Sequence, residues 1–346
     1  MFAIPDDLAS FTGGYGYARK LLEWLPRLGV EAFHLPLSRK FPNAASSDLD
    51  DAVRAINDAV QPGNAVLIDG LAFGVFSEAA ARAVKVPIAA LCHHPLGLEA
   101  GLKPERSRAL LASEKKALAH AARIIVPSPH IARTLQEDFE VPLTRIRVAL
   151  PGTEPARRAA GSCGPLSLLA AGSITPRKSF GVLIEALAGL QGLDWRLTII
   201  GSHRHSPETA AALAKLIAAK GLGPRVQCPG ELEGAAFADA FHRSGIFVSS
   251  SLYEGYGMAL AEAMARGLPI VMTAGGAAAE TVPDAAALKA APGDAAALRE
   301  ALRLMIVDEG LRKRMSDASW RAGQTLPSWR DTAKAVVCAV KEAILP

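Results

Sequence analysis

The stretch GIFVSSSLYEGYGMALAEAMARGLPIVMT, Gly245 to Thr273, carries the pattern that decides the fold. It begins with a short apolar run, passes through a Gly-rich turn into an Ala-rich helical segment at 258–266, and ends with a second apolar run. Neither apolar run alternates with polar residues, which is typical of strands buried on both faces of a parallel sheet. The stretch therefore predicts a strand–helix–strand unit.

The same alternation continues over most of the chain. In the first half the strand candidates are FAIP, AVLIDG, PIAALC and RIIVPS, and helices are expected at 15–28, 48–60, 76–85 and 105–121. In the second half the strand candidates are LSLLAAG, RLTIIG, RVQCPG, GIFVSS and LPIVMT, with helices expected at 179–190, 207–220, 234–243 and 258–266. Two successive series of this kind indicate two doubly wound α/β domains.

A segment rich in Pro and Gly, LPGTEPARRAAGSCGP, separates the two series and has no apolar period. A chain of 346 residues is also long enough for two cores. We therefore predict an N-terminal domain over 1–150, a linker over 151–165 and a C-terminal domain over 166–328. A last helix at 329–346 is expected to pack back on the first domain.

Composition narrows the class of protein. Half of the residues are apolar, 21% are charged and the formal net charge is +4, which is typical of a globular protein and far from a nucleic-acid-binding extreme. The four cysteines, Cys92, Cys163, Cys228 and Cys338, form no CxxC pair, so reduced thiols are expected rather than a zinc site or disulfides. The N-terminal residues do not resemble a signal peptide, because no basic segment precedes an apolar run, and no apolar run reaches membrane-spanning length; we therefore expect a cytoplasmic protein.

Two loops of the first half follow predicted strands, where ligands bind in such sheets. Gly13, Gly14 and Gly16 come before a helix, and their backbone could approach a phosphate or a sugar; an ordinary strand-to-helix turn is the alternative. His93 and His94 follow the strand PIAALC. A histidine there can orient a sugar hydroxyl or a phosphate, whereas adjacent side chains point apart and do not suggest a zinc pair.

Two loops of the second half carry charge. Arg177 and Lys178 precede a helix start and suit a diphosphate, with a solvated basic loop as the alternative. Glu254 lies in the turn YEGYG and Glu262 lies in the following helix, where carboxylates can accept the vicinal hydroxyls of a ribose or hexose. Their spacing of eight carries little weight, since 19 glutamates give about one such pair by chance.

The segment 103–133 contains seven Lys or Arg and two Glu and is expected to be largely helical. A solvated helix face explains it simply. The alternative is peripheral contact with the inner face of a membrane or with a lipid-linked acceptor.

Taken together, these stretches resemble the retaining GT-B glycosyltransferases of glycosyltransferase family 4. The second half matches in order through AAGSITPRKSFGVLIEAL, LTIIGSH, GELEG, FVSSSLYEGYGMALAEAMARGLPIV and PGDAAALREAL. The first half matches more loosely, through the double-glycine loop and the His loop. The resemblance implies two Rossmann-like domains that face a cleft, with a nucleotide sugar bound mainly to the second.

The resemblance also implies roles for single residues. Glu254 would face the donor sugar, Lys178 would contact the diphosphate and Glu262 would bind the ribose hydroxyls. The remaining implied contacts are backbone of Gly255, Tyr256, Gly257 and Met258 at the sugar and diphosphate, backbone of Leu232 over the base, Gly13 and Gly14 at the phosphate, and His93 near the transferred sugar. Ser173 stands where family members often carry Arg, and Arg177 is the candidate substitute.

The resulting hypothesis is a retaining hexosyltransferase that uses a UDP- or GDP-sugar and needs no metal or other cofactor. Its acceptor would be a glycan, lipid-linked or small-molecule hydroxyl in polysaccharide, glycolipid or glycoconjugate synthesis, and no nucleic acid partner is expected. Two alternatives stay open at this point: a sugar-nucleotide 2-epimerase of the same architecture, and a non-catalytic module that binds sugar nucleotides.

Overall fold

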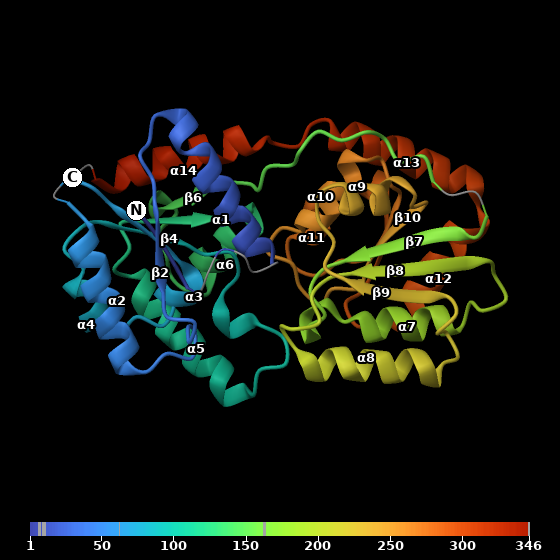
Figure 1. Ribbon diagram of the computed structural model, residues 1–346, viewed down its shortest axis with the longest axis horizontal. Coiled ribbons are helices and arrows are strands. Elements are labelled where there is room, and N and C mark those ends of the chain that lie inside the picture. The colour runs from blue at the N-terminus through green and yellow to red at the C-terminus, as the bar shows by residue number, and fades with distance from the viewer. Residues whose placement is uncertain (6–7, 9–11, 62, 162–163, 345–346) are drawn as a thin grey trace. The chain divides into compact units, whose positions relative to one another are not determined.

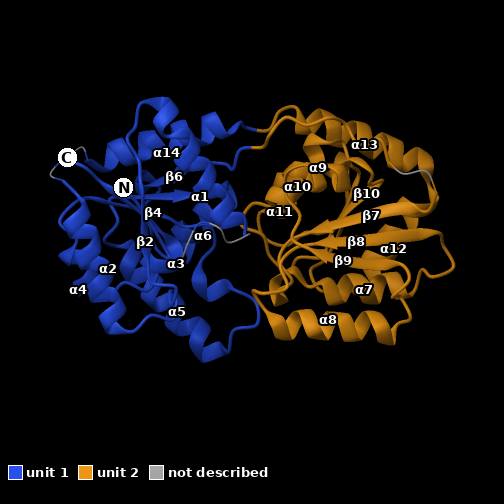
Figure 2. Cartoon of the chain, in the orientation of Figure 1, with its two compact units in different colours: residues 1–152, 327–346 blue, residues 153–326 orange. Residues whose placement is uncertain are grey.

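The computed structural model describes the chain except for residues 6–7, 9–11, 62, 162–163 and 345–346. The chain forms two compact units (Figure 2): unit 1 is Met1–Gly152 with Pro327–Pro346, and unit 2 is Thr153–Leu326. The division falls at the start of the expected linker. Residues of that linker pack on unit 2, because the Ala159 N–H donates to the Arg266 carbonyl at 2.8 Å. Cys163 lies outside the described residues.

Unit 1 is built on a parallel sheet (Figure 1). Its strands are β1 (Phe2–Pro5), β2 (His34–Leu37), β3 (Val66–Asp69), β4 (Ile88–Leu91), β5 (Arg123–Val126) and β6 (Ile146–Val148), in the order β2-β1-β3-β4-β5-β6. Its helices are α1 (Gly13–Trp24), α2 (Ser46–Ala59), α3 (Gly70–Phe73), α4 (Glu78–Ala83), α5 (Pro104–Leu118), α6 (Pro129–Glu137) and α14 (Trp329–Ile344).

Helices cover both faces of this sheet. α1 and α14 lie side by side, and α14 contacts β4, β5 and β6, while α2, α4 and α5 form a second layer (Figure 1). Every residue of β1, β3 and β4 is consequently buried. This explains why their sequences show no polar alternation.

Unit 2 is built on a second parallel sheet. Its strands are β7 (Leu166–Ala171), β8 (Trp195–Ile200), β9 (Val226–Gly230), β10 (Ile246–Ser249), β11 (Ile270–Thr273) and β12 (Ala287–Ala290), in the order β12-β11-β10-β7-β8-β9. Its helices are α7 (Phe180–Ala188), α8 (Pro207–Ala219), α9 (Gly234–His242), α10 (Met258–Ala265), α11 (Ala278–Thr281), α12 (Ala295–Val307) and α13 (Glu309–Gly323).

Successive residues of these strands enter opposite layers of the core. Leu168 packs with α7, α8 and α12, whereas the next residue, Leu169, packs with α9 and α10. Val248 and Phe247 divide in the same way. Figure 1 shows α7 and α8 on one face of the sheet and α9 and α10 on the other. The apolar runs of the sequence therefore fill two layers at once.

The structure contains elements that the sequence analysis did not list, among them the helices α6, α12 and α13, and three short edge strands. β2, β6 and β12 were not expected, and each has partly exposed residues at the edge of its sheet. Such strands carry only a weak apolar signal. The expected helix at 15–28 begins instead at Gly13, because the Thr12 hydroxyl accepts a hydrogen bond from the Tyr15 N–H and caps the helix there. The glycines therefore form its first turn.

Strand order decides where a ligand can bind. In unit 2 the chain moves outward from β7 through β8 to β9, then returns to place β10 on the other side of β7. This reversal is the dinucleotide-binding strand order, and ligands bind where the C-terminal ends of the two central strands diverge. The loops after β7 and β10 meet at that point, and they carry Lys178 and Glu254.

Candidate functional sites in the two units

Glu254 is the centre of the candidate site in unit 2. Its side chain is 10% exposed, and Lys178 Nζ lies 2.5 Å from Glu254 Oε1. Arg177 Nη1 lies 3.4 Å from Glu254 Oε2 and donates to the Tyr253 carbonyl at 3.0 Å. The fold thus brings together the charged loops that the sequence singled out separately.

Hydrogen bonds to backbone carbonyls join the loop after β7 to the loop after β10. The Leu252 N–H donates to the Arg177 carbonyl at 2.8 Å, and the Ser250 hydroxyl donates to the Lys178 carbonyl at 3.0 Å. Gly172 (φ +148°) leaves room for the lysine, since a Cβ there would lie 2.7 Å from Lys178 Cε. The Lys178 stem therefore crosses the backbone at the end of β7.

A third loop, which follows β11, also binds the backbone of Glu254. The Glu254 N–H donates to the Gly275 carbonyl at 3.2 Å, and the Ala277 N–H donates to the Glu254 carbonyl at 2.8 Å. The Ser251 hydroxyl donates to Glu254 Oε1 at 2.6 Å, and Ser251 is anchored in turn by Thr273. Sequence reasoning missed Ser251 and Gly275. Their signal was position only, directly after β10 and β11.

The electrostatics exclude Glu254 as a general acid at neutral pH. Burial alone raises the pKa of the Glu254 carboxyl. The charges of Lys178 and Arg177, with hydrogen bonds from Lys178 and Ser251, outweigh that effect and lower the pKa to about 2. The group is therefore ionised and can only accept hydrogen bonds.

The helix after this turn begins at Met258. Gly257 caps it with φ +99°, a conformation that favours glycine. Tyr256 is buried, and its carbonyl accepts from the Thr281 hydroxyl at 2.7 Å. Glu262 is 23% exposed, and its carboxylate pairs with Arg266 one helical turn away. The structure does not bring Glu262 into the ion-paired cluster of Glu254.

The other unit 2 candidates lie at neighbouring strand ends. Ser173 follows β7. Leu232 follows β9 and packs on the core layer beside α9. Directly before Leu232 lies a pocket of about 400 Å³, lined by Ser202, His203, Arg204, Cys228, Pro229, Gly230 and Glu231. Sequence reasoning reached Leu232 but missed the pocket, because its wall joins two loops distant in the sequence.

In unit 1 the structure brings Gly14 to His93. A Cβ at Gly14 would lie 3.3 Å from His93 Cδ2, so the α1 N-terminus and the His loop are in contact. The ring of Tyr17 packs edge-on against His93 with centroids 5.0 Å apart. The Tyr17 hydroxyl donates to the Ala149 carbonyl at 3.0 Å, so this support is itself anchored.

His93 lies beside Asp69, which sequence reasoning treated only as part of the strand AVLIDG. His93 Nε2 is 3.9 Å from Asp69 Oδ2, and the described residues give this nitrogen no hydrogen-bond partner. Burial lowers the pKa of His93 to about 4 and raises the pKa of Asp69 to about 6. At neutral pH the imidazole is therefore uncharged.

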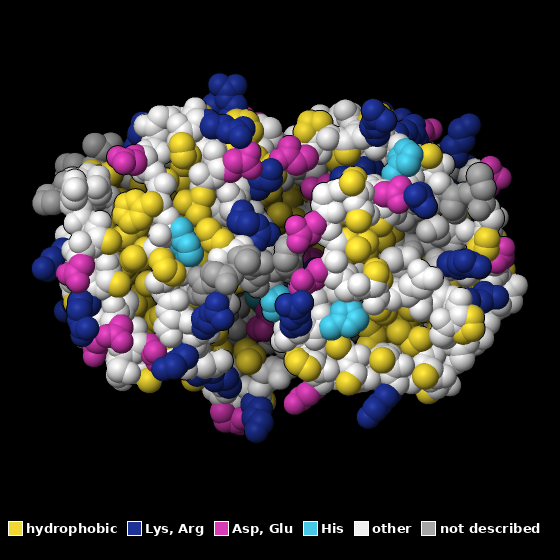
Figure 3. All heavy atoms as spheres, viewed as in Figure 1, with side chains coloured by type: hydrophobic (Ala, Val, Ile, Leu, Met, Phe, Trp, Pro, Cys, Tyr) yellow, Lys and Arg dark blue, Asp and Glu magenta, His cyan; other side chains and the backbone are white. Residues whose placement is uncertain are grey.

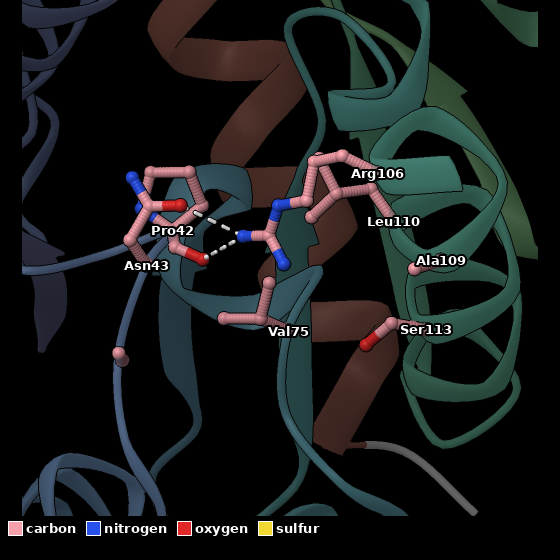
Figure 4. Close-up of a pocket in the computed structure, with 8 residues that line it drawn as sticks. Pro42, Asn43, Val75, Arg106, Ala109, Leu110 and Ser113 are labelled. Atoms are coloured by element: carbon pink, nitrogen blue, oxygen red, sulfur yellow. Dashed lines mark hydrogen bonds between the residues drawn. The ribbon is translucent and has the colours of Figure 1, made fainter. Parts of the chain in front are cut away.

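Unit 1 has a separate pocket of about 350 Å³ between the loop after β2 and α5 (Figure 4). Arg106 reaches across it, and its Nη2 donates to the Pro42 carbonyl at 3.1 Å and to Asn43 Oδ1 at 2.8 Å. The guanidinium thus ties α5 to the loop. Ser113 and Val75 lie on the pocket wall.

Several cations of the basic segment 103–133 lie in ion pairs. Three of its cations pair with carboxylates: Arg108 with Glu105 at 3.6 Å, Lys115 with Glu140 at 2.7 Å and Arg123 with Glu342 at 3.1 Å. On the face shown in Figure 3, basic and acidic side chains are interspersed. Within the described residues, no helix combines the length and apolar character that crossing a membrane requires. Membrane contact stays a prediction.

Two family descriptions match consecutive parts of the chain. Residues 15–157 match "Glycosyltransferase Family 4" and residues 158–321 match "Glycosyl transferases group 1". The chain belongs to family 4 of the glycosyltransferases. A similar curated relative is D-inositol 3-phosphate glycosyltransferase of Salinispora tropica, 27% identical over 71% of this chain and 56% of the relative. The chain spans about half the length of the curated relatives it matches.

Solved structures show that this family 4 protein has the GT-B fold. Sucrose-phosphate synthase from Thermosynechococcus elongatus aligns with a TM-score of 0.79 and 19% identity, covering 97% of each chain. Anabaena HepE in complex with UDP and glucose aligns with a TM-score of 0.74 and 14% identity, covering 97% of this chain and 98% of that chain. At these identities the likeness concerns the fold.

Proposed function

We propose that the chain is a retaining glycosyltransferase that moves a hexose from a nucleoside diphosphate sugar to an acceptor hydroxyl. The observation that carries this proposal is the ionised Glu254 carboxylate, held between Lys178 and Arg177 at the switch point of the unit 2 sheet. This arrangement offers two cations for a diphosphate and an acceptor-only group for sugar hydroxyls.

Donor binding would redistribute these contacts. Two cations and one carboxylate leave the cluster with one net positive charge. The diphosphate would contact Lys178 and Arg177 while Glu254 accepts hydrogen bonds from the hexose. Backbone of Gly255, Tyr256, Gly257 and Met258 would line the sugar and diphosphate, beside Ser173. The N-terminus of α10 adds partial positive charge on the same side.

The nucleoside would lie along the ends of β8 and β9. The base would enter the pocket of about 400 Å³ next to Leu232, whose backbone would cover it. Glu262 would bind the ribose hydroxyls and share its carboxylate with Arg266. The UDP complex of HepE supports a nucleotide-sugar donor, and we propose a UDP- or GDP-sugar.

We assign the acceptor side to unit 1, where Gly13, Gly14 and His93 would meet the phosphate and the transferred sugar. The acceptor oxygen forms a bond to the anomeric carbon on the face from which the diphosphate departs. The bond from that carbon to the phosphate oxygen breaks, the diphosphate takes the electron pair, and the acceptor proton passes to it. Lys178 and Arg177 would stabilise the charge that develops there, so we propose that no metal is needed.

A donor panel tests the proposal. Purified protein is incubated with UDP-, GDP- and ADP-sugars and candidate hydroxyl acceptors, while nucleoside diphosphate release and thermal shift are measured. We expect one donor to raise the melting temperature and to release diphosphate with EDTA present. NMR of the product should show the donor's anomeric configuration. Failure of every nucleotide sugar to bind would contradict the proposal.

The same assay separates the two alternatives. Conversion of a nucleotide sugar to its 2-epimer without acceptor would identify an epimerase. Binding without turnover across acceptor classes, together with unchanged cellular function in Glu254→Ala and Lys178→Ala variants, would identify a binding module.

A further inference from the structure

The buried carboxyl group of Glu114 contacts both ends of the turn that carries His93. Glu114 lies in α5 and is 1% exposed. Its Oε2 accepts a hydrogen bond from the Leu96 N–H at 2.7 Å, and the Cys92 thiol donates to its Oε1 at 3.7 Å. Because Cys92 and Leu96 flank residues 93–95, one side chain closes the turn that leaves β4.

Helix α5 contacts this loop at a second point. The Ser107 hydroxyl, two turns earlier in α5, donates to the Gly97 carbonyl at 2.6 Å. The carboxyl group is also enclosed on its other side, since a Cβ at Gly74 would lie 3.3 Å from Glu114 Cδ. Glu114 therefore has little freedom to move, and Ser107 provides an independent tie beyond the histidines.

Burial of the Glu114 carboxyl group lowers the stability of the fold, because a polar group is removed from water. Within the described residues Glu114 forms no ion pair, and burial raises its pKa to about 8. The other titratable groups beside it are the Cys92 thiol and, beyond Cys92, Asp69. An apolar side chain would fill the same space without the cost of removing a polar group from water. What such a side chain could not do is hold the Leu96 N–H.

We propose that Glu114 is a positioning residue that fixes the turn 92–96 and, through it, the imidazole of His93. The catalytic consequence rests on the proposed function, in which His93 lies beside the transferred sugar. Without the carboxyl group, the turn would relax and the imidazole would move. A displacement near 1 Å can lower turnover by about 100-fold.

Three variants separate positioning from general support of the fold. Glu114→Leu removes the acceptor, while Glu114→Gln keeps an oxygen for the Leu96 N–H. Ser107→Ala is the matched control, because it removes one hydrogen bond from α5 to the same loop. We expect Glu114→Leu to lower kcat by about 10- to 100-fold with an unchanged KM for the donor. Glu114→Gln and Ser107→Ala should keep kcat within about twofold.

A measurement without turnover tests the turn directly. In protein with isotope-labelled histidines, the His93 ring signal should move in Glu114→Leu and stay in place in Ser107→Ala and Glu114→Gln. If Glu114→Leu does not fold, Glu114→Asn replaces it, since its amide is one methylene too short to reach Leu96. An unmoved His93 signal in the folded variant, or equal loss in the Gln variant, would overturn the proposal.

These arms distinguish the two proposals. If the wild-type protein transfers no sugar from any donor, the proposed function fails, while the His93 signal still decides whether Glu114 positions the turn.

Discussion

Buried carboxyl groups occur at the strand ends of both units, but their surroundings differ. In unit 2, Glu254 lies between Lys178 and Arg177, and its pKa falls to about 2. In unit 1, no described Lys or Arg pairs with Asp69 or Glu114, and burial raises their pKa values to about 6 and about 8. Similar sheets can therefore hold a carboxyl group among cations that keep it charged, in a setting suited to a diphosphate, or in an apolar setting that shifts it toward its neutral form.

The largest expected effect comes from removing a cation of unit 2. Lys178→Ala should lower kcat for sugar transfer by about 100- to 1,000-fold, since the leaving diphosphate loses its main charge partner. Steady-state release of nucleoside diphosphate measures this. Lys220→Ala is the control, because Lys220 pairs with Glu185 on the surface of the same unit. Equal rates in both variants would contradict the role of Lys178.

The carboxylate of unit 2 can be neutralised without changing its shape. Glu254→Gln should destabilise the protein by about 3 kcal/mol at pH 7, because Lys178 and Arg177 lose their counterion. Folding lowers the pKa of Glu254 from 4.5 to about 2, so its stabilising contribution is present above pH 4.5 and is lost as the pH falls toward 2. Urea unfolding across this pH range should show that the difference in free energy of unfolding between wild type and Glu254→Gln becomes smaller as the pH falls.

A matched surface change provides the control for that experiment. Glu300→Gln alters an exposed glutamate that pairs with Arg303, and it should change stability little at any of these pH values. If the difference in free energy of unfolding between wild type and Glu254→Gln stayed constant from pH 7 to pH 2, the carboxylate would not be paired and ionised as described.

The carboxyl group of Glu114 should lower stability at high pH, whereas that of Glu254 should lose its stabilising effect at low pH. Its pKa rises from 4.5 to about 8 on folding, so stability is greatest below pH 4.5 and is lost as the pH rises through 8. Glu114→Gln should be close to wild type at pH 5 and more stable at pH 8, by on the order of 2 kcal/mol. Glu105→Gln, exposed on the same helix, should follow the wild-type curve. If stability changed with pH in parallel for wild type and Glu114→Gln, the pKa of Glu114 would not be raised, and the contrast with Glu254 would be lost.

The smallest of these effects concerns the path of the lysine stem. Gly172→Ala should raise the donor KM about tenfold, since the new methyl group would displace Lys178. Gly192→Ala is the control, because a Cβ there meets no atom within 4 Å. An unchanged KM for Gly172→Ala would show that Lys178 adapts.

Much of unit 2 could be predicted from the sequence because its signals are local. The buried strands are continuous apolar runs, and the loops with Lys178 and Glu254 directly follow two of them. What the sequence could not provide was the strand order, which decides that these two loops meet. The assigned roles of the site residues stay predictions.

The candidate site in unit 1 was harder to predict because its polar groups lie within apolar sequence patterns. Asp69 reads as the end of a strand, and Glu114 reads as part of a charged run, ASEKK. A signal for Glu114 existed: it lies four residues from both Leu110 and Leu118, on the buried stripe of α5. Contacts such as Leu96 to Glu114 join segments 18 residues apart and leave no periodic trace.

The return of α14 to unit 1 has a consequence for synthesis. Trp329 and Val336 are buried, and α14 covers β4, β5 and β6, which are made some 200 residues earlier. A ribosome therefore completes every segment of unit 2 before the first sheet receives its last cover. We expect unit 2 to complete its folding first. Until α14 is made, the face of the unit 1 sheet that α14 covers stays exposed and accessible to chaperones.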